Sequence, residues 1–151
     1  MKIDIYMIAK ASNDDFDKLI NDFIKMSSKY SKINIHYIFN NEISKAQNIS
    51  QEEAQKIYTK TYQPYLKGYN VALDVLGKNI DTFAFSNLLE NKMQINFFIG
   101  GAYGFQREFL DLCDTTIKLS NLTFAHKLAT LVLSEQIFRG LTIINNHPYH
   151  K

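Results

Sequence analysis

The sequence has little of what marks secreted or membrane proteins. It contains a single cysteine, Cys113, so no disulfide can form within the chain, and a reducing compartment fits best. We expect Cys113 to be a small buried residue on a helix, because no catalytic partner stands near it in the sequence. No stretch approaches the roughly 18 apolar residues that a membrane helix needs. The first ten residues alternate apolar and polar side chains, which predicts a strand and not a signal peptide, so we expect a cytoplasmic protein without a membrane partner.

The sequence also lacks a strong excess of charge of one sign. Its 17 Lys and Arg residues nearly balance its 15 Asp and Glu residues, for a formal net charge of +2. Many nucleic-acid-binding domains are far more basic, but a small total can hide a one-sided patch. Internal repeats and low-complexity segments are absent too, and 151 residues favour a single domain spanning 1–151. Composition therefore leaves the function open.

Strand and helix patterns alternate along the chain. Alternating or continuous apolar residues predict five strands, at 2–8, 33–39, 70–76, 95–99 and 116–119. The third strand contains the run VALDVL, which predicts burial on both faces. Residues 40–49 are expected to form a loop. Five strands separated by helices predict an α/β fold, an α/β/α sandwich with a mainly parallel sheet of five or six strands.

The helices between these strands have recognisable starts. Ser12, Ser50 and either Asp81 or Thr82 are expected to cap them, and Pro64 should end or bend the second. The first helix carries apolar residues at helical spacing, which predicts one buried stripe: Phe16, Leu19, Ile20, Phe23 and Ile24. The last helix, from about 125 to 139, is apolar almost all round and should be buried on more than one side. In so small a chain another copy is the natural second partner, which predicts a homodimer.

Ligands of parallel sheets bind beyond the carboxyl ends of the strands, which points to the loops after Val75, Ile99 and Leu119. The glycines within 100–104 directly follow a buried strand, so they permit either close approach of a ligand or an ordinary tight turn. The segment 119–126 mixes small polar and apolar residues. It could hold an adenine through backbone hydrogen bonds, although taken by itself it is more simply the start of a helix.

Side chains that can carry chemistry gather near the end of the sequence. Glu135 and Arg139 stand four residues apart on an apolar helix face, which favours either a stabilising ion pair or a guanidinium held for a ligand. The segment NHPYHK, residues 146–151, adds two imidazoles and a phenol, which can transfer protons and stack on bases. We do not expect a metal site, because two histidines without a nearby cysteine or carboxylate are a poor ligand set.

Three segments resemble a known family: FFIGGAYGF (97–105), KLSNLTFAHKLATLVLSEQIFRG (118–140) and NHPYHK (146–151). They are similar to the RlmH-type ribosomal large-subunit pseudouridine N3-methyltransferases, which belong to the SPOUT class of knotted methyltransferases. The similarity covers the whole chain in length and strand order and is most specific over 97–151. The chain departs from many relatives at Ala102, Ala125 and Lys118. We expect these departures to affect the rigidity of the loops and the affinity for the cofactor more than the chemical step.

The resemblance implies a homodimeric enzyme whose C-terminal part is threaded into a deep trefoil knot, with S-adenosylmethionine bound in the knot. The cofactor-binding residues that it implies are Leu73, Gly100, Leu119, Ser120, Asn121, Leu122, Thr123 and Phe124. The implied substrate is a pseudouridine of 23S ribosomal RNA in assembled ribosomes, methylated at N3. Glu135, Arg139, Tyr149 and His150 match the positions tied to substrate binding and catalysis.

The methyl group of S-adenosylmethionine is already activated, so the enzyme needs mainly to position it in line with N3 of the pseudouridine. The side chains then have few chemical roles to fill. We expect His150 to act as general base and Tyr149 to shape or hydrogen-bond the nucleobase. Arg139 would hold a phosphate or the imidate anion, and Glu135 would orient Arg139. Two alternatives stay open: a nucleotide-binding module without catalysis, which has no need of NHPYHK, and a ribosome-associated factor of the same fold that has lost activity.

Overall fold

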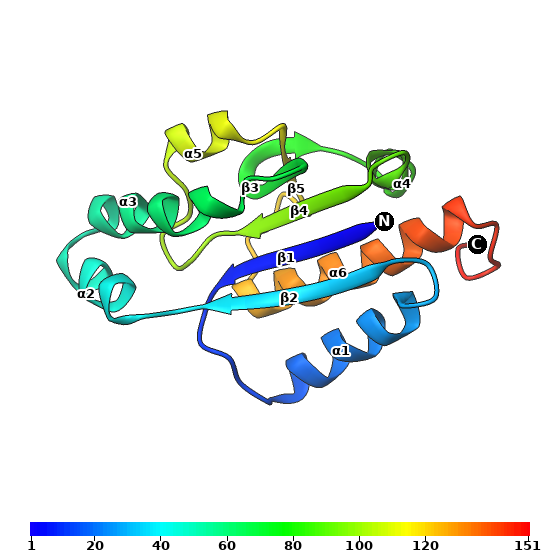
Figure 1. Cartoon of the computed structure of the whole chain (residues 1–151), viewed down its shortest axis with the longest axis horizontal. Helices are drawn as coiled ribbons and strands as arrows, with labels where there is room; N and C mark the ends of the chain where they lie inside the picture. The colour runs from blue at the N-terminus through cyan, green and yellow to red at the C-terminus, as the bar shows by residue number, and fades with distance from the viewer.

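The computed structural model describes residues 1–151 and contains one sheet of five strands in the order β2-β1-β4-β3-β5, with all neighbours parallel (Figure 1). The strands are β1 (Lys2–Ile8), β2 (Lys32–Ile38), β3 (Tyr69–Asn79), β4 (Gln94–Ile99) and β5 (Thr115–Lys118). All five predicted strands are present, and their alternating or continuous apolar patterns placed them within a few residues. The prediction of an α/β fold with a parallel sheet is confirmed.

Helices cover both faces of the sheet. They are α1 (Asp15–Ser27), α2 (Asn41–Ile49), α3 (Gln51–Tyr62), the 3₁₀ helix η1 (Gln63–Tyr65), α4 (Thr82–Leu89), α5 (Arg107–Leu112) and α6 (His126–Ile144). On one face α6 lies between α1 and α4, over a core that includes Ile5 and Leu133. On the other face α2, α3 and α5 pack around Phe98 and Phe109. Each face thus has its own apolar layer, as in other α/β sandwiches.

Two of the predicted caps are confirmed and one is wrong. The Ser50 hydroxyl accepts from the Glu53 amide (3.1 Å) at the start of α3, and Asp81 caps α4. The cap of α1 is Asp14 and not Ser12: its carboxylate accepts from the Asp17 amide (3.1 Å), and the Asp17 side chain accepts from the Asp14 amide. This reciprocal capping box satisfies two helix-start donors at once, which a single hydroxyl at Ser12 could not do.

Residues 40–49, predicted as a loop, contain the helix α2 instead. Asn40 caps it by accepting from the Ile43 amide (2.9 Å). Ile43 and Ala46, three residues apart on one face, are buried in the core beside α3. The helix is therefore held by two short apolar contacts and a cap, although most of its residues are polar and match a loop in composition.

Helices α1 and α6 keep apolar surface in contact with solvent. Ile20 is fully buried, but the side chains of Phe16 and Leu19 are 41% and 49% exposed, so the predicted stripe of α1 is only partly buried. Helix α6 continues to Ile144, beyond its predicted end, and Leu128 on it is also exposed. None of the helices combines the length and the apolar character that crossing a membrane would require.

Strand β3 is irregular where it passes the carboxyl end of the sheet. Its first half is buried, as at Val71, but Leu76 is 87% exposed, so the predicted burial on both faces is wrong for the second half. The reason is a break in pairing with β5 between Leu73 and Lys78. The ladder can resume because Gly77 lies against the backbone of Ile117, where a Cβ atom would come within 2.4 Å of the carbonyl carbon. The bulged residues form one wall of a cavity.

Candidate functional site

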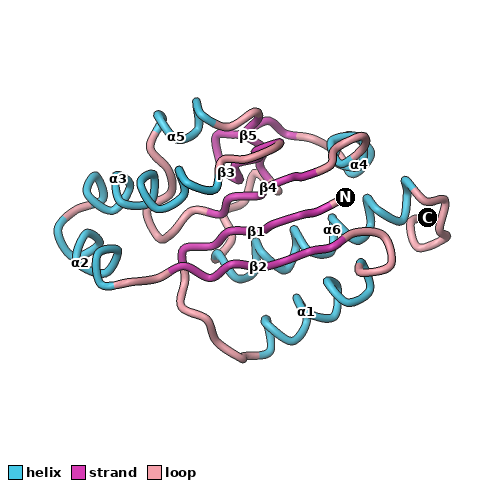
Figure 2. Tube along the Cα trace, in the orientation of Figure 1, coloured by secondary structure: helices cyan, strands magenta, loops and turns pink.

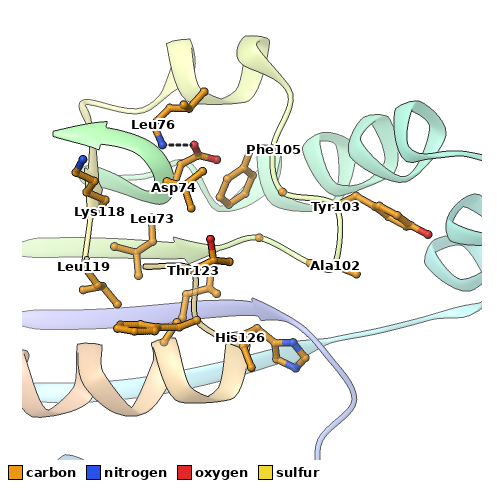
Figure 3. A pocket seen from close by; sticks show the side chains of 18 of the residues that line it. Leu73, Asp74, Leu76, Ala102, Tyr103, Phe105, Lys118, Leu119, Thr123 and His126 are labelled. Carbon is orange, nitrogen blue, oxygen red and sulfur yellow. Dashed lines mark hydrogen bonds between the residues drawn. The ribbon is translucent and has the colours of Figure 1, made fainter. Parts of the chain in front are cut away.

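A cavity of about 620 Å³ opens at the carboxyl ends of β3 and β4 (Figure 3). Its walls are residues 73–76, 99–105, 118–120 and 122–126, with Gln51, Gln55 and Ala129. These are the irregular part of β3 and the loops after β4 and β5. The sequence predicted a ligand crevice at the loops after Val75, Ile99 and Leu119, but Val75 lies within β3, which continues to Asn79. The volume lies within the range of about 300–1,000 Å³ that is usual for sites that bind small molecules.

The structure brings together seven of the eight predicted cofactor-binding residues in this cavity: Leu73, Gly100, Leu119, Ser120, Leu122, Thr123 and Phe124. Asn121 lies in the same loop but does not line the cavity. Figure 3 shows Leu73, Leu119 and Thr123 gathered at its centre, whereas the Tyr103 side chain points away. Sequence reasoning missed Asp74, the only carboxylate in the wall, because it stands inside an apolar run that resembles an ordinary buried strand.

The loop between β5 and α6 offers unpaired backbone donors to the cavity. The Leu122 amide donates to the Ser120 hydroxyl (3.0 Å). The other amides of this loop, at Ser120, Asn121, Thr123, Phe124 and Ala125, donate to no group in the chain. Asn121, Thr123 and Ala125 are exposed, so water can satisfy these amides in the free protein, and a bound ligand rich in acceptors can take the place of that water.

The glycine loop after β4 is backed by α3. The buried Tyr62 hydroxyl lies 2.5 Å from the Ile99 carbonyl and 3.2 Å from the Tyr6 carbonyl, which fixes the point where β4 ends. Burial raises the pKa of Tyr62 well above its usual value, so it remains a donor. Gly101 packs directly on the ring of Tyr58, and a Cβ atom there would lie 2.6 Å from that ring. The glycine is therefore needed for close packing of the loop on α3.

A buried ion pair fixes the start of α6, next to the cavity wall. Lys127 Nζ lies 3.0 Å from the Asp17 carboxylate and also contacts Asp14 and Ser12. Tyr37 donates to the other oxygen of Asp17 (2.8 Å). Burial alone would raise the pKa of Asp17, but the hydrogen bonds from Ser12, Lys127 and Tyr37 outweigh it and hold that pKa well below its usual range. We call this group the Lys127 clasp.

We expect Lys127→Met to lower the free energy of unfolding by about 3 kcal/mol at pH 7, because it leaves the buried Asp17 carboxylate without its cation. A depressed pKa contributes stability above the unfolded value, which is about 4 for Asp, and that stability is lost as the pH falls toward the folded value. The difference between variant and wild type should therefore shrink below about pH 4. Urea denaturation at pH 7 and pH 3 measures the loss of stability and its dependence on pH.

Lys56→Met is the matched control, because Lys56 forms only exposed pairs with Glu52 and Glu53. It should leave stability unchanged at either pH. Equal stability of Lys127→Met and wild type at pH 7 would show that the Lys127 clasp does not stabilise the fold.

The four predicted catalytic residues form one hydrogen-bonded group at the other end of α6. Glu135 Oε1 accepts from Arg139 Nε (2.9 Å) and Nη2 (2.5 Å) and from the Tyr149 hydroxyl (3.1 Å). Arg139 Nη1 lies 3.2 Å from His150 Nδ1, and the guanidinium stacks on the Tyr149 ring at 4.7 Å. The tail reaches this position because Asn146 turns the chain with a positive φ of 54°, after which the His147 amide donates to the Thr142 carbonyl (2.9 Å).

This geometry restricts the protonation states in the group. Burial and the hydrogen bond to Glu135 raise the pKa of Tyr149, so the phenol stays protonated at neutral pH. The hydrogen bond to Glu135 also raises the pKa of Arg139, which stays cationic. Since a guanidinium can only donate, the contact with His150 fits an Nδ1 that accepts and an Nε2 that carries the proton.

The cavity and the tail group lie at opposite ends of α6. The cavity is lined by His126 and Ala129 at the start of the helix, and Arg139 follows ten residues later. At a helical rise of about 1.5 Å per residue these points are roughly 15 Å apart. Figure 1 likewise shows the C-terminus at the far end of α6 from the loop that follows β5. Within one chain the predicted cofactor and catalytic residues therefore do not meet.

Cys113 lies at the C-terminal cap of α5 and not on the helix itself. It is half-buried, and burial together with the charge of Asp114 raises the pKa of its thiol to about 12. The thiol is therefore protonated and unreactive at neutral pH.

Comparison with known proteins gives concordant results. Residues 1–150 match the family described as "Predicted SPOUT methyltransferase". The chain is 65% identical over 151 residues to the ribosomal RNA large subunit methyltransferase H of Aliarcobacter butzleri, and each chain is covered completely. The protein of the same name from Campylobacter concisus is 48% identical, again with complete coverage of both chains.

Solved structures share the fold at much lower identity. A "probable methylase family protein" of Haemophilus influenzae Rd KW20 superposes with a TM-score of 0.56 at 13% identity, covering 95% of this chain and 66% of its own. A TrmH/SpoU tRNA modifying enzyme of A. aeolicus gives a TM-score of 0.50 at 12% identity, covering 99% of this chain and 81% of its own. At such identities these likenesses concern the fold alone.

Proposed function

The chain belongs to the SPOUT methyltransferase family, and from this membership we propose that it methylates 23S ribosomal RNA with S-adenosylmethionine as the methyl donor, at N3 of a pseudouridine. The observation that carries the proposal is the pairing of two sites in one chain. One is a cavity walled by unpaired backbone amides, and the other is a group of Arg139, Tyr149 and His150 suited to a nucleobase. A purely nucleotide-binding module would use only the first.

The cavity walls fit S-adenosylmethionine. The unpaired amides within residues 120–125, all but that of Leu122, suit the acceptor nitrogens of adenine, and Leu73 and Leu119 provide apolar surface for its ring. We assign the Asp74 carboxylate to the hydroxyl groups of the ribose, because it is the only anionic acceptor in the wall. When bound, the cofactor supplies a methyl group on a sulfonium, which a ring nitrogen can attack directly.

A homodimer resolves the separation between the two sites. A second copy packed against α6 in the opposite direction would place the tail of one protomer over the cavity of its partner. Exposed apolar side chains on α1, α6 and the cavity rim are available for such a contact: Phe16, Leu19, Met26, Leu122 and Leu128. Single exposed apolar side chains are ordinary, but three on α1 together with Leu122 and Leu128 fit an interface between copies.

The trefoil knot is a further part of this proposal. Strand β5 lies at an edge of the sheet. From it the chain returns through residues 119–125 to α6, which lies between α1 and α4 in the helix layer on one face of the sheet. A return of this kind is where the SPOUT class threads its chain. Because the returning segment also walls the cavity, threading would hold the amides of residues 120–125 in place without a helix cap, which α6 lacks.

The tail group can position and activate the nucleobase. Arg139 would stabilise the anion that forms when the imide nitrogen loses its proton, and Glu135 orients Arg139 through its two hydrogen bonds. His150 would accept that proton once Arg139 turns from Nδ1 toward the substrate, because Nδ1 is the ring nitrogen without a proton. Tyr149 stays a neutral phenol and would contact the base through its ring and hydroxyl.

The direct test is mass mapping of ribosomal RNA after incubation with the protein and S-adenosylmethionine. Ribosomes that lack the modification should gain one methyl group at one pseudouridine of the large subunit. Naked 23S RNA should be a poor substrate, because a chain with a net charge of +2 has little general affinity for phosphates. Cofactor binding without methyl transfer to ribosomes would support the non-catalytic alternative, and efficient transfer to a short isolated stem-loop would contradict the preference for ribosomes.

A further inference from the structure

One half of the sheet face opposite α6 is not covered by a helix. Residues of β1, β2 and β4 that point to this face form rungs across the sheet. Lys2 pairs with Lys32 and Gln94, Asp4 with Asn34 and Asn96, and Tyr6 with His36 and Phe98. Over β4, residues 65–67 close the face, since Asn96 Nδ2 donates to the Tyr65 carbonyl (3.1 Å) and to that of Lys67. Over β1 and β2 it stays open, and no helix lies in front of these strands in Figure 2.

The accessible residues of this region are Lys2, Lys32, Asn34, His36 and Tyr65, which we call the open face. Two of its rings are exposed yet firmly held. His36 stacks on Tyr6 with ring centroids 4.6 Å apart, and Tyr65 stacks on Tyr6 at 4.7 Å. Tyr6 itself is buried, while the side chains of His36 and Tyr65 are each about 40% exposed. Rings held in this way lose little conformational freedom when a planar ligand stacks on them.

A buried carboxylate fixes the orientation of His36. Asp4 is fully buried, and its Oδ1 accepts from Asn34 Nδ2 (2.8 Å) and contacts His36 Nε2 (2.9 Å). Burial alone would raise the pKa of Asp4, but the hydrogen bonds from His36, Lys2 and Asn34 lower it, so the group is ionised. A carboxylate only accepts, so Nε2 carries a proton, and Nδ1 remains available to a ligand.

The charge of the open face is positive. Asp4 is the only carboxylate among the residues that β1, β2 and β4 present here, and Lys2 Nζ neutralises it at 2.7 Å. Lys32 has no ion-pair partner in the structure. Two exposed rings beside the unpaired Lys32 match a ligand with planar bases and phosphates better than an acidic peptide, which offers charge but no planar groups.

We propose that the open face docks a single-stranded segment of ribosomal RNA, with bases stacked on His36 and Tyr65 and the backbone running past Lys32. This proposal rests on the proposed function, and it adds a contact surface separate from the cavity and from the tail group. Sheets that bind single-stranded RNA use the same combination of exposed rings and nearby cations. The modest net charge of the whole chain is compatible with it, because a small total charge does not prevent a local cationic contact such as Lys32.

Steady-state methyl transfer to ribosomes tests the proposal through KM. Tyr65→Ala should raise the KM for ribosomes about tenfold, the usual effect of losing one stacked base. Lys32→Glu should raise it similarly and make KM less dependent on salt. Both variants should keep kcat at saturating ribosomes and the affinity for S-adenosylmethionine. Lys60→Glu is the control, because Lys60 is an exposed lysine on α3 that pairs with Glu42. An unchanged KM in both variants would overturn the proposal.

A second measurement does not depend on methyl transfer. A 12-residue oligouridylate containing 4-thiouridine is photo-crosslinked to the full-length protein, and the crosslinked peptides are mapped by mass spectrometry. Crosslinks at His36 or Tyr65 that are weakened by Lys32→Glu are the expected result, even if the chain proves inactive as a methyltransferase. Crosslinks confined to other surfaces, or displacement of the oligonucleotide from this face by poly-glutamate at equal concentration, would overturn the proposal.

Discussion

Arg139→Ala should lower kcat for methyl transfer to ribosomes by about 10²–10³-fold, the usual effect of removing a donor that stabilises a developing anion. The substrate nitrogen must lose a proton before it attacks, and Arg139 is the only permanent cation in the tail group. Its removal would also leave Glu135 and Tyr149 without the group that they orient. The affinity for S-adenosylmethionine should stay within a factor of about two, because Arg139 is assigned to the nucleobase and is not among the residues that line the cavity.

Arg107→Ala is a matched control for this prediction. Arg107 also pairs with a carboxylate four residues along its helix, Asp111, at 3.1 Å, but its side chain is 85% exposed. Single-turnover kinetics on ribosomes should show wild-type rates for this variant. Arg139→Lys should restore little activity, since an ammonium group cannot make the paired contacts of a guanidinium. Full methyl transfer by Arg139→Ala would remove Arg139 from the mechanism.

Gly101→Val should weaken the binding of S-adenosylmethionine by about 100-fold. Any side chain at this position meets the ring of Tyr58, at 2.6 Å from the new Cβ, and that ring is fully buried with its hydroxyl 2.5 Å from Gln47 Nε2. The glycine loop must therefore move toward the cavity. Loss of two or three cofactor hydrogen bonds, at about 1 kcal/mol each, corresponds to roughly 100-fold in affinity.

The cause can be checked by making room for the new side chain. Tyr58→Leu alone should keep cofactor affinity near that of the wild type, because Tyr58 does not line the cavity. Combined with Gly101→Val it should recover much of the lost affinity, measured by isothermal titration. Additive losses in the double variant would contradict the steric explanation and point to a direct role of Gly101.

Local sequence patterns were sufficient for the sheet and for part of the site. The spacing of apolar residues predicted the five strands, and the rule that ligands bind beyond the carboxyl ends of parallel strands selected the loops after β4 and β5 that wall the cavity. The identities of the individual cofactor and catalytic residues came from resemblance to a family, because a segment such as 119–126 by itself also matches a plain helix start. Local patterns therefore predicted where the site lies, but they did not predict which reaction it carries out.

The features that sequence reasoning missed depend on contacts between distant parts of the chain. Lys127 and Asp17 of the clasp are 110 positions apart, and neither stands out among surface residues of its own helix. Asp74 became a cavity residue only because β3 breaks its pairing with β5. The open face likewise exists because α3 and the turn after it cover β4 and leave β1 and β2 free. Which strands a helix covers depends on how the helices pack on the sheet, and the pattern of residues along the sequence does not contain this information.

The central claim is that the cavity of one protomer and the tail of its partner form each active site. It is tested most directly by mixing Gly101→Val and Arg139→Ala chains, denaturing and refolding them together, and measuring methyl transfer to ribosomes. At a cofactor concentration near the wild-type Kd each homodimer should be nearly inactive, whereas a mixed dimer has one intact cavity opposite one intact tail. Random pairing makes half of the dimers mixed, each with one of two sites working, so roughly a quarter of the wild-type activity should return. No recovery, with mixed dimers confirmed by native mass spectrometry, would contradict the claim.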